Sequence, residues 1–227
     1  MRKTKTFLLL CLLMALFPAR MIFCQQKNQQ SRFIIARVKY HGGGDWYNDP
    51  SAIPNLLKFI EQNGNLLTAS DEQRVELIDQ KLFSFPALFL TGHGRITFSE
   101  QEAVNLRKYL IHGGFLYADD DYGMDHYFRQ EIKKVFPDKE LVEIPFDHII
   151  YQQPFYFAKG LPKIHEHDGG PPRGFGIFHQ GRMVVYYTYN TNISDGWPDP
   201  DVHNNPEAVR LRALQMGVNI FMYALSH

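Results

Sequence analysis

Polar and glycine-rich segments follow three apolar stretches that are typical of buried strands. The apolar stretches span residues 33–40, 87–91 and 115–118. The segments after them are His41-Gly42-Gly43-Gly44-Asp45-Trp46, Thr91-Gly92-His93-Gly94 and Asp119-Asp120-Asp121-Tyr122. Ligands of open α/β sheets bind outside the carboxyl ends of the strands. We therefore expect these segments to form one polar site that offers carboxylates, an imidazole and backbone amides.

Three adjacent carboxylates repel one another unless they are solvated, hydrogen-bonded or paired with a cation. One interpretation of Asp119, Asp120 and Asp121 is a turn in which one aspartate caps the following helix. The other makes them catalytic residues, with Asp119 or Asp120 acting as a base, a metal ligand or an acceptor for a sugar hydroxyl. The sequence leaves both interpretations open.

His93 lies between two glycines, where the backbone can approach a ligand closely. It is a candidate general base or ligand nitrogen, and the alternative is a turn histidine that bonds a neighbouring carbonyl. The triple glycine offers amides to an anion but lacks the lysine and hydroxyl of a P-loop, which argues against nucleotide binding. Trp46 and Tyr47 beside it offer stacking on a sugar ring. The candidate ligand-binding residues are Gly43, Gly44, Asp45, Trp46, Gly92, Gly94 and Tyr122.

His165-Glu166-His167-Asp168 is the segment richest in metal-ligating side chains. In extended backbone, residues two apart face the same way, so both imidazoles could hold one divalent metal ion. The candidate metal ligands are His148, His165, His167 and Asp168, and His203 is a further completing ligand. The alternative is a polar loop with two exposed histidines.

Strand and helix patterns alternate along the chain and predict an α/β fold, with a mostly parallel sheet and helices on both faces. Ser99 and Glu102 form a capping-box pattern, and Asp125 is expected to cap the next helix. We expect residues 75–83 to form a short amphipathic segment and residues 145–174 to form a long irregular loop. A hairpin over 175–189 and a long helix from Asn205 to about Leu225 close one domain, residues 33–227.

Residues 1–25 are typical of a secretory signal peptide, followed by a linker over 26–32. Arg2, Lys3 and Lys5 precede an 11-residue apolar run that is too short to span a bilayer. We expect cleavage near Cys24 or Gln25 and a periplasmic or secreted product; a lipidated Cys24 and an uncleaved anchor are the alternatives. Later segments show no transmembrane pattern.

The composition excludes several classes of function. Both cysteines, Cys11 and Cys24, lie in the signal region, so the mature part offers no catalytic thiolate. Four of the 24 basic residues but none of the 24 acidic residues lie there, which leaves the mature part acidic. With no basic patch, nucleic acid is not an expected partner. The sequence also lacks the G-x-S-x-G elbow of serine hydrolases.

Several unusual strings resemble the bacterial family called domain of unknown function 4159 over about 33–223. They include ARVKYHGGGDWYNDP, LTGHG, GGFLYADDDYG, PFDHIIY, GLPKIHEHDG and SDGWPDPDVH. The resemblance implies a fold similar to class I glutamine amidotransferases, which are flavodoxin-like. Asp119 stands about where those enzymes carry their nucleophilic cysteine, so thioester chemistry does not carry over. The family context implies envelope proteins as partners.

Three classes of function remain open at this stage. The first is hydrolysis of a small polar or carbohydrate ligand by an aspartate or histidine base, with a divalent metal as an optional cofactor. The second is a non-catalytic module that binds a glycan or a protein. The third is a structural accessory of an envelope complex.

Overall fold

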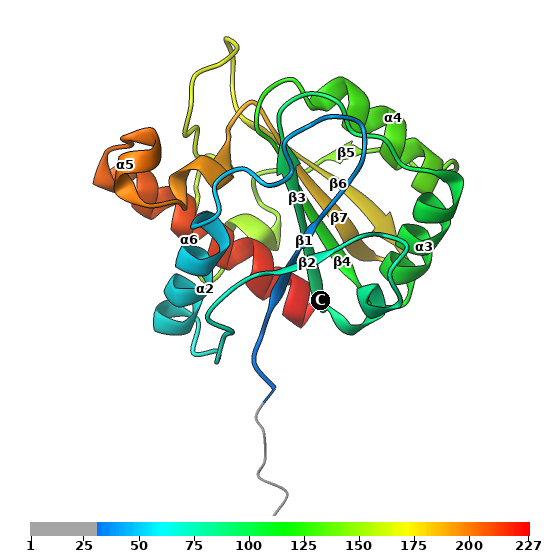
Figure 1. Cartoon of the computed structure of the whole chain (residues 1–227). Coiled ribbons are helices and arrows are strands. Elements are labelled where there is room, and N and C mark those ends of the chain that lie inside the picture. The colour runs from blue at the N-terminus through cyan, green and yellow to red at the C-terminus, as the bar shows by residue number, and fades with distance from the viewer. Residues whose placement is uncertain (1–30) are drawn as a thin grey trace, which may run out of the picture. The chain divides into compact units, whose positions relative to one another are not determined.

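Seven strands pair into one sheet in the computed structural model, which describes residues 31–227 (Figure 1). They are β1 (Ile35–Val38), β2 (Gln73–Val75), β3 (Ala87–Gly92), β4 (Phe115–Asp120), β5 (Val142–Glu143), β6 (Arg173–His179) and β7 (Arg182–Tyr189). The sheet order is β2-β1-β3-β4-β7-β6-β5. The predicted signal peptide, most of the predicted linker and both cysteines lie outside the described residues.

Five neighbouring strands of the sheet are parallel, from β2 through β1, β3 and β4 to β7. The hairpin partner β6 and the edge strand β5 run antiparallel to their neighbours. This confirms the predicted mostly parallel sheet and its hairpin. The order of the parallel part is that of doubly wound, flavodoxin-like sheets, in which the direction of winding reverses between β1 and β3.

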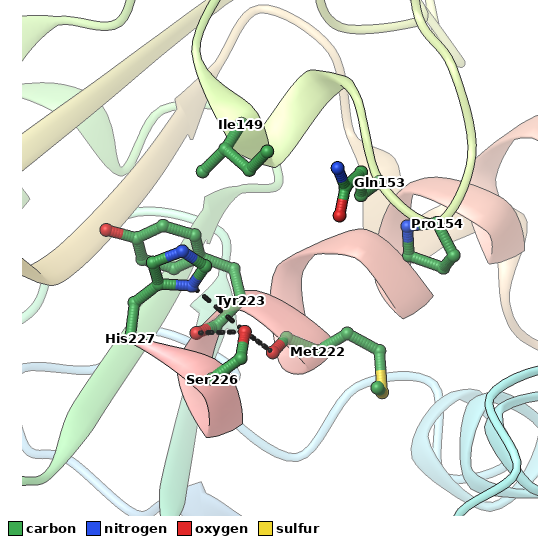
Figure 2. Close-up of a pocket in the computed structure, with 7 residues that line it drawn as sticks. All are labelled: Ile149, Gln153, Pro154, Met222, Tyr223, Ser226 and His227. Carbon is green, nitrogen blue, oxygen red and sulfur yellow. Dashed lines mark hydrogen bonds between the residues drawn. The ribbon is translucent and has the colours of Figure 1, made fainter.

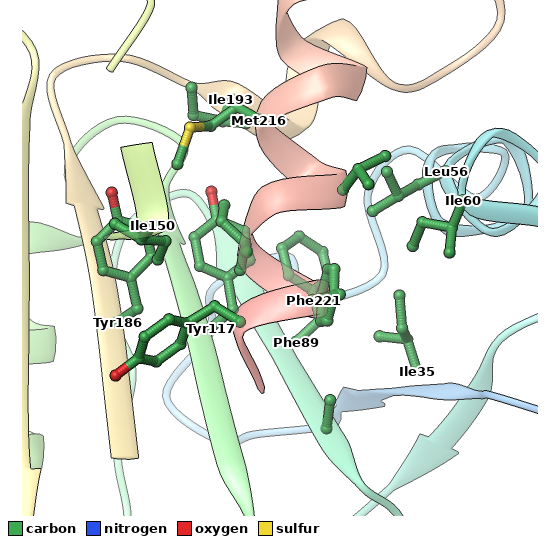
Figure 3. Close-up of a cluster of buried hydrophobic side chains, with 14 of the residues drawn as sticks. Ile35, Leu56, Ile60, Phe89, Tyr117, Ile150, Tyr186, Ile193, Met216 and Phe221 are labelled. Carbon is green, nitrogen blue, oxygen red and sulfur yellow. The ribbon is translucent and has the colours of Figure 1, made fainter. Parts of the chain in front are cut away.

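Helices cover both faces of the sheet, as the alternating pattern predicts. They are α2 (Ala52–Asn63), α3 (Glu100–Ile111), α4 (Asp125–Val135), the short α5 (Pro200–His203) and α6 (Glu207–Ser226). Successive residues of a strand face opposite sides, so Phe89 packs in the core with α2 and α6, while Leu88 and Leu90 pack with α3 and α4. Figure 3 shows the first core, in which Phe89, Tyr117 and Phe221 gather against α6. Among the described helices, none is long and apolar enough to cross a bilayer.

Trp197 joins this core to the loop after β7. It is fully buried, its ring lies 5.4 Å from that of Phe89 and 6.0 Å from that of Tyr117, and its Nε1 donates to the Ala213 carbonyl. The 3-10 turn η4 (Ile193–Gly196) precedes it directly. The packing of the Trp197 ring therefore fixes η4, in the loop that follows the carboxyl end of β7.

Local capping signals give one confirmed and one wrong prediction. Ser99 and Glu102 form the predicted capping box of α3. Asp125 does not cap α4, because it is the first helical residue and its carboxylate accepts from Arg129 and from the Tyr187 hydroxyl. The carboxylate of Asp120 instead accepts from the Met124 amide at the start of the helix.

Two predicted segments differ in the structure. Residues 75–83 are not one amphipathic piece, since they divide between the end of edge strand β2 and the 3-10 turn η2 (Gln80–Ser84). The loop 145–174 contains the 3-10 turn η3 (Ile149–Tyr151) and buries Phe157 in the core. The buried Asn219 of α6 fixes this loop, because its side-chain amide donates to the carbonyls of Ile150 and Phe155.

Candidate functional site

Loops after four parallel strands meet at the carboxyl edge of the sheet. Parallel pairing of β1, β3, β4 and β7 places all four carboxyl ends on one side. The side chains that these loops and their neighbours bring together are Asp45, Asn48, Asp49, His93, Asp121, His165, Asn192, Asp195 and His203. We call this group the edge cluster.

The three aspartates at the end of β4 have three different roles. Asp119 is fully buried and accepts hydrogen bonds from the Thr188 hydroxyl and the Ser194 amide, so it ties β4 to β7 and η4. Burial raises its pKa to about 7. Asp120 closes the turn before α4, and burial raises its pKa to about 6. Only Asp121 belongs to the edge cluster.

His93 and Asp45 form a close pair where the sheet winding reverses. The His93 Nδ1 lies 3.0 Å from Asp45 Oδ2 and 3.3 Å from Asp121 Oδ2, and the His93 amide donates to Asp45 Oδ1 over 2.6 Å. The His93 side chain is 54% exposed. An imidazole that donates from Nδ1 to a carboxylate carries its lone pair on Nε2, which makes the second nitrogen a base.

Asp121 and Asp195 are two buried carboxyl groups linked by Asn192. The Asn192 side-chain amide donates to Asp121 Oδ1 over 2.9 Å and to Asp195 Oδ2 over 3.2 Å, and Asn48 donates to Asp121 Oδ2. Burial, reinforced by the negative charge of Asp195, raises the pKa of Asp121 well above its usual range. Burial alone would raise the pKa of Asp195 as well, but hydrogen bonds, first of all from His165, lower it.

Two histidines, His165 and His203, lie close to Asp195. His165 Nδ1 is 2.7 Å from Asp195 Oδ2, and His203 Nε2 is 2.8 Å from Asp49 Oδ2 and 3.8 Å from Asp195 Oδ1. Hydrogen bonding to Asp195 raises the pKa of His165. One ligand atom each from His165, Asp195 and His203 all lie within 4.8 Å of one another, so these three residues could hold a metal ion.

Arg37 of β1 supports the loop that carries Asp45, Asn48 and Asp49. Its side chain is fully buried, pairs with Glu72 over 2.7 Å and donates to three backbone carbonyls of that loop. A buried cation that is shared among so many acceptors fixes the loop path. Arg37 therefore positions part of the edge cluster without belonging to it.

Two of the four glycines predicted to bind ligand, Gly44 and Gly92, allow close backbone packing. A Cβ at Gly44 would lie 2.7 Å from the His93 carbonyl oxygen, and the Gly44 amide donates to the Arg95 carbonyl. A Cβ at Gly92 would lie 2.2 Å from the Tyr40 hydroxyl. Gly43 and Gly94 have positive φ angles and open space around them. The amide of Gly44 is thus not free to bind an anion.

Aromatic side chains line the rim of the edge cluster. Tyr122 is 49% exposed, has a φ of 98° that side chains rarely adopt, and stacks on His167 with ring centres 4.5 Å apart. The His167 ring lies 5.9 Å from that of His165. Trp46 is half-buried and lies edge-on to the exposed Tyr47. The Tyr122–His167 stack is therefore an aromatic surface beside His165.

The structure does not bring His148 or Asp168 close to His165 and His203, the two histidines beside Asp195. His148 caps η3, because its side chain accepts from the Ile150 amide, and its ring lies 5.5 Å from that of Tyr223. Its neighbours Ile149, Tyr223 and His227 line a mostly apolar pocket of about 490 Å³ at the end of α6 (Figure 2). Asp168 is exposed and only its backbone carbonyl is engaged, by Lys163. The pocket therefore lies away from the titratable groups of the edge cluster.

Sequence reasoning missed Asn48, Asp49, Asn192 and Asp195 as site residues. The signal that could have found the last two is the rule that located His93 and Asp121. Asn190-Thr191-Asn192 and Asp195 follow β7, and β7 runs parallel to β4. Only the place of β7 inside the parallel part of the sheet shows that its carboxyl end belongs to the site.

The family model described as Domain of unknown function (DUF4159) matches residues 34–225. The chain belongs to this family. No curated protein matches the chain. The matched range of the DUF4159 domain includes every residue of the edge cluster. The family description names no reaction, so the chemistry of the site rests on its geometry.

The expected resemblance of DUF4159 to amidotransferases concerns one position of the site, that of their nucleophilic cysteine. Asp119, the residue that the resemblance places about where those enzymes carry cysteine, is buried and bonded to Thr188 and Ser194. No cysteine occurs within residues 31–227. The described part of the chain therefore has no thiol for a glutaminase reaction.

Proposed function

We propose that this DUF4159 domain hydrolyses a small, uncharged polar or carbohydrate substrate at the edge cluster, with His93 as general base. The observation that carries the proposal is the His93–Asp45 pair, in which a half-exposed imidazole is held through Nδ1 by a carboxylate. A positioned histidine is the commonest general base in enzymes. Its Nε2 would take a proton from the attacking water.

Asp45 and Asp121 support this role of His93. Both carboxyl groups lie within 3.3 Å of Nδ1, so a proton on that nitrogen has two acceptors, and the Asp45 carboxylate is the counter-charge of the imidazolium formed during the reaction. The amide bond from His93 to Asp45 also fixes the backbone of the turn. The pair is thus oriented before a substrate arrives, which lowers the reorganisation cost of catalysis.

The charges of the edge cluster favour an uncharged substrate. Asp45, Asp49 and Asp195 bring three carboxylates together beside the carboxyl group of Asp121, and within residues 31–227 the side-chain ion pairs of these four residues are all with histidines. Nearby Arg37 is already bound to Glu72 and backbone carbonyls. A phosphate or sulfate group would be repelled there, whereas hydroxyl groups would find acceptors.

A second candidate is a carbohydrate-binding module without catalysis. The observation that favours it is the exposed Tyr122–His167 stack at the rim of the edge cluster. A sugar face would pack on this aromatic surface while its hydroxyls bond to the carboxylates. In this case binding would depend on Tyr122 and hydrolysis would not occur. In either case we propose that the chain acts in the periplasm or outside the cell, as residues 1–25 predict.

The test compares neutral and anionic probes with the same leaving group. The purified chain is assayed with p-nitrophenyl acetate, a set of p-nitrophenyl glycosides, and p-nitrophenyl phosphate and sulfate. We expect hydrolysis of at least one neutral probe and none of the anionic probes above the rate in buffer. Faster hydrolysis of the phosphate or sulfate would contradict the proposal. Binding of a sugar without hydrolysis of any probe would favour the second candidate.

A further inference from the structure

We propose that His165, Asp195 and His203 form a binding site for one divalent transition-metal ion, with zinc as the best-fitting metal. The three residues come from the long loop 145–174, from η4 and from α5, and their ligand atoms lie within 4.8 Å of one another. Zinc bonds to histidine are about 2.0–2.1 Å long, so small rotations of the imidazoles would bring the atoms to one ion. Nothing in the His93 mechanism requires this ion, so the inference goes beyond the proposed function.

A neighbour outside the group, Asn205, lies behind the His165 ring. His165 Nε2 lies 3.1 Å from Asn205 Oδ1, while the amide nitrogen of Asn205 donates to the Asp195 carbonyl over 3.0 Å. Because that second bond orients Asn205, its oxygen faces the imidazole and accepts from Nε2. With an ion bound at Nδ1, His165 would keep its proton on Nε2 and donate it to Asn205. Metal-binding histidines are usually held in this way by an acceptor behind them.

Asp195 offers an oxygen that the protein itself does not satisfy. Its Oδ1 is buried and has no hydrogen-bond partner in the structure, although the residue is only 4% exposed. A buried acceptor without a partner destabilises the fold, because it has lost its hydrogen bonds to water. This oxygen lies 3.8 Å from His203 Nε2, on the side where the ligand atoms converge. A cation between them would remove that cost.

The donor set selects the kind of metal. Two imidazole nitrogens and one carboxylate are typical of zinc and related transition metals, whereas calcium and magnesium prefer oxygen ligands throughout. Three protein ligands leave a coordination position for water, as in catalytic zinc sites. Asp49, 2.8 Å from His203 Nε2, adds a further carboxylate. Both histidine side chains are about one-quarter exposed, so an ion can enter from solvent.

The competing explanation is a cluster of protonated histidines paired with carboxylates. In that case His165 and His203 would be cations bound to Asp195 and Asp49, and no metal would bind with defined stoichiometry. The two explanations differ in one property, the affinity for zinc at a pH where imidazoles are neutral. Metal binding requires neutral histidine ligands and becomes stronger as pH rises through their titration.

The test measures zinc binding by calorimetry at pH 7.5 on the full chain, purified without a histidine tag and dialysed against chelator. The variants are His165→Ala/His203→Ala and the matched control His112→Ala/His126→Ala, which removes two exposed histidines elsewhere. We expect one zinc per chain in the wild type and the control, and affinity at least about 100-fold weaker in the site variant. Equal affinity in both double variants, or no stoichiometric binding by the wild type, would overturn the proposal.

A second measurement uses only the wild type, in case the site variant does not fold. Imidazole ¹⁵N spectra are recorded while zinc chloride is added to one equivalent. We expect the ring signals of His165 and His203 to shift and those of His112 and His126 to stay in place. Shifts confined to other histidines would overturn the proposal. Because neither measurement uses a substrate, a failure here is distinct from a failure of the proposed hydrolysis.

Discussion

Replacing His93 with alanine is expected to lower kcat/KM by about 10²- to 10⁴-fold, the usual contribution of a general base. The substrate would be the neutral probe that the wild type hydrolyses fastest. The free energy of unfolding should change by less than about 1 kcal/mol, because the side chain is half-exposed. Asp45→Asn should lower kcat as well, since the imidazole loses the carboxylate that orients it.

The matched control for His93 is His126→Ala, an exposed histidine on α4. We expect wild-type kcat/KM for this control. Wild-type activity in His93→Ala would exclude His93 as the base. An activity loss that only parallels a large loss of stability would assign His93 a structural role.

Arg37→Met is expected to lower the free energy of unfolding by about 3–5 kcal/mol, the typical cost of breaking a buried ion pair. The substitution leaves the buried Glu72 carboxylate without its partner and removes the donor to the carbonyls of Trp46, Asn48 and Asp49. The loop that carries Asp45 would lose its support, so activity should also decrease. Urea denaturation measures the first effect.

Lys39→Met, two residues further along the chain, is the matched control for Arg37. Lys39 also pairs with a glutamate, Glu76, but both side chains are partly exposed, whereas those of Arg37 and Glu72 are buried. Exposed ion pairs contribute about 0–1 kcal/mol, so we expect a small change. Equal destabilisation by the two substitutions would contradict the supporting role of Arg37. The double variant Arg37→Met/Glu72→Met should recover part of the loss, because it leaves no unpaired charge.

The elements that the sequence predicts correctly are those with local signals. The capping box at Ser99 and the apolar run 87–91 each specify an element from neighbouring residues. Edge strand β2 was missed because it has three residues with only one buried side chain, too few for a periodic pattern. The place of β7 beside β4 depends on pairing between residues about 70 positions apart, for which the sequence carries no local signal.

The part of the candidate site that has local signals could also be predicted from the sequence. His93, Asp121 and Asp45 follow recognisable strands, so the strand-end rule locates them. Asp195 and Asn192 follow β7, and the sequence carries no signal that β7 pairs with β4. His148 precedes His165 by only 17 positions, but η3 and the bonds from Asn219 direct this part of the loop toward Tyr223. Distance along the chain is a poor guide inside a loop of this length.

We infer that the edge cluster serves function at the expense of stability. Active sites often hold like charges together at a cost in folding free energy. Asp121 is buried beside Asp195, and its raised pKa means that the folded protein retains a proton that the unfolded chain releases. Asp121 therefore destabilises the fold progressively as pH rises above the unfolded value of about 4.

The most direct measurement is the free energy of unfolding of Asp121→Asn against the wild type, in chelator, from pH 5 to pH 9. We predict that the variant is more stable by about 1 kcal/mol or more at pH 8, with a smaller difference at pH 5. Asp138→Asn, which breaks an exposed pair with Arg107, should instead be neutral or slightly destabilising. If the Asp121→Asn variant is less stable than the wild type across this range, the inference that Asp121 costs stability is wrong, because its carboxyl group would then stabilise the fold.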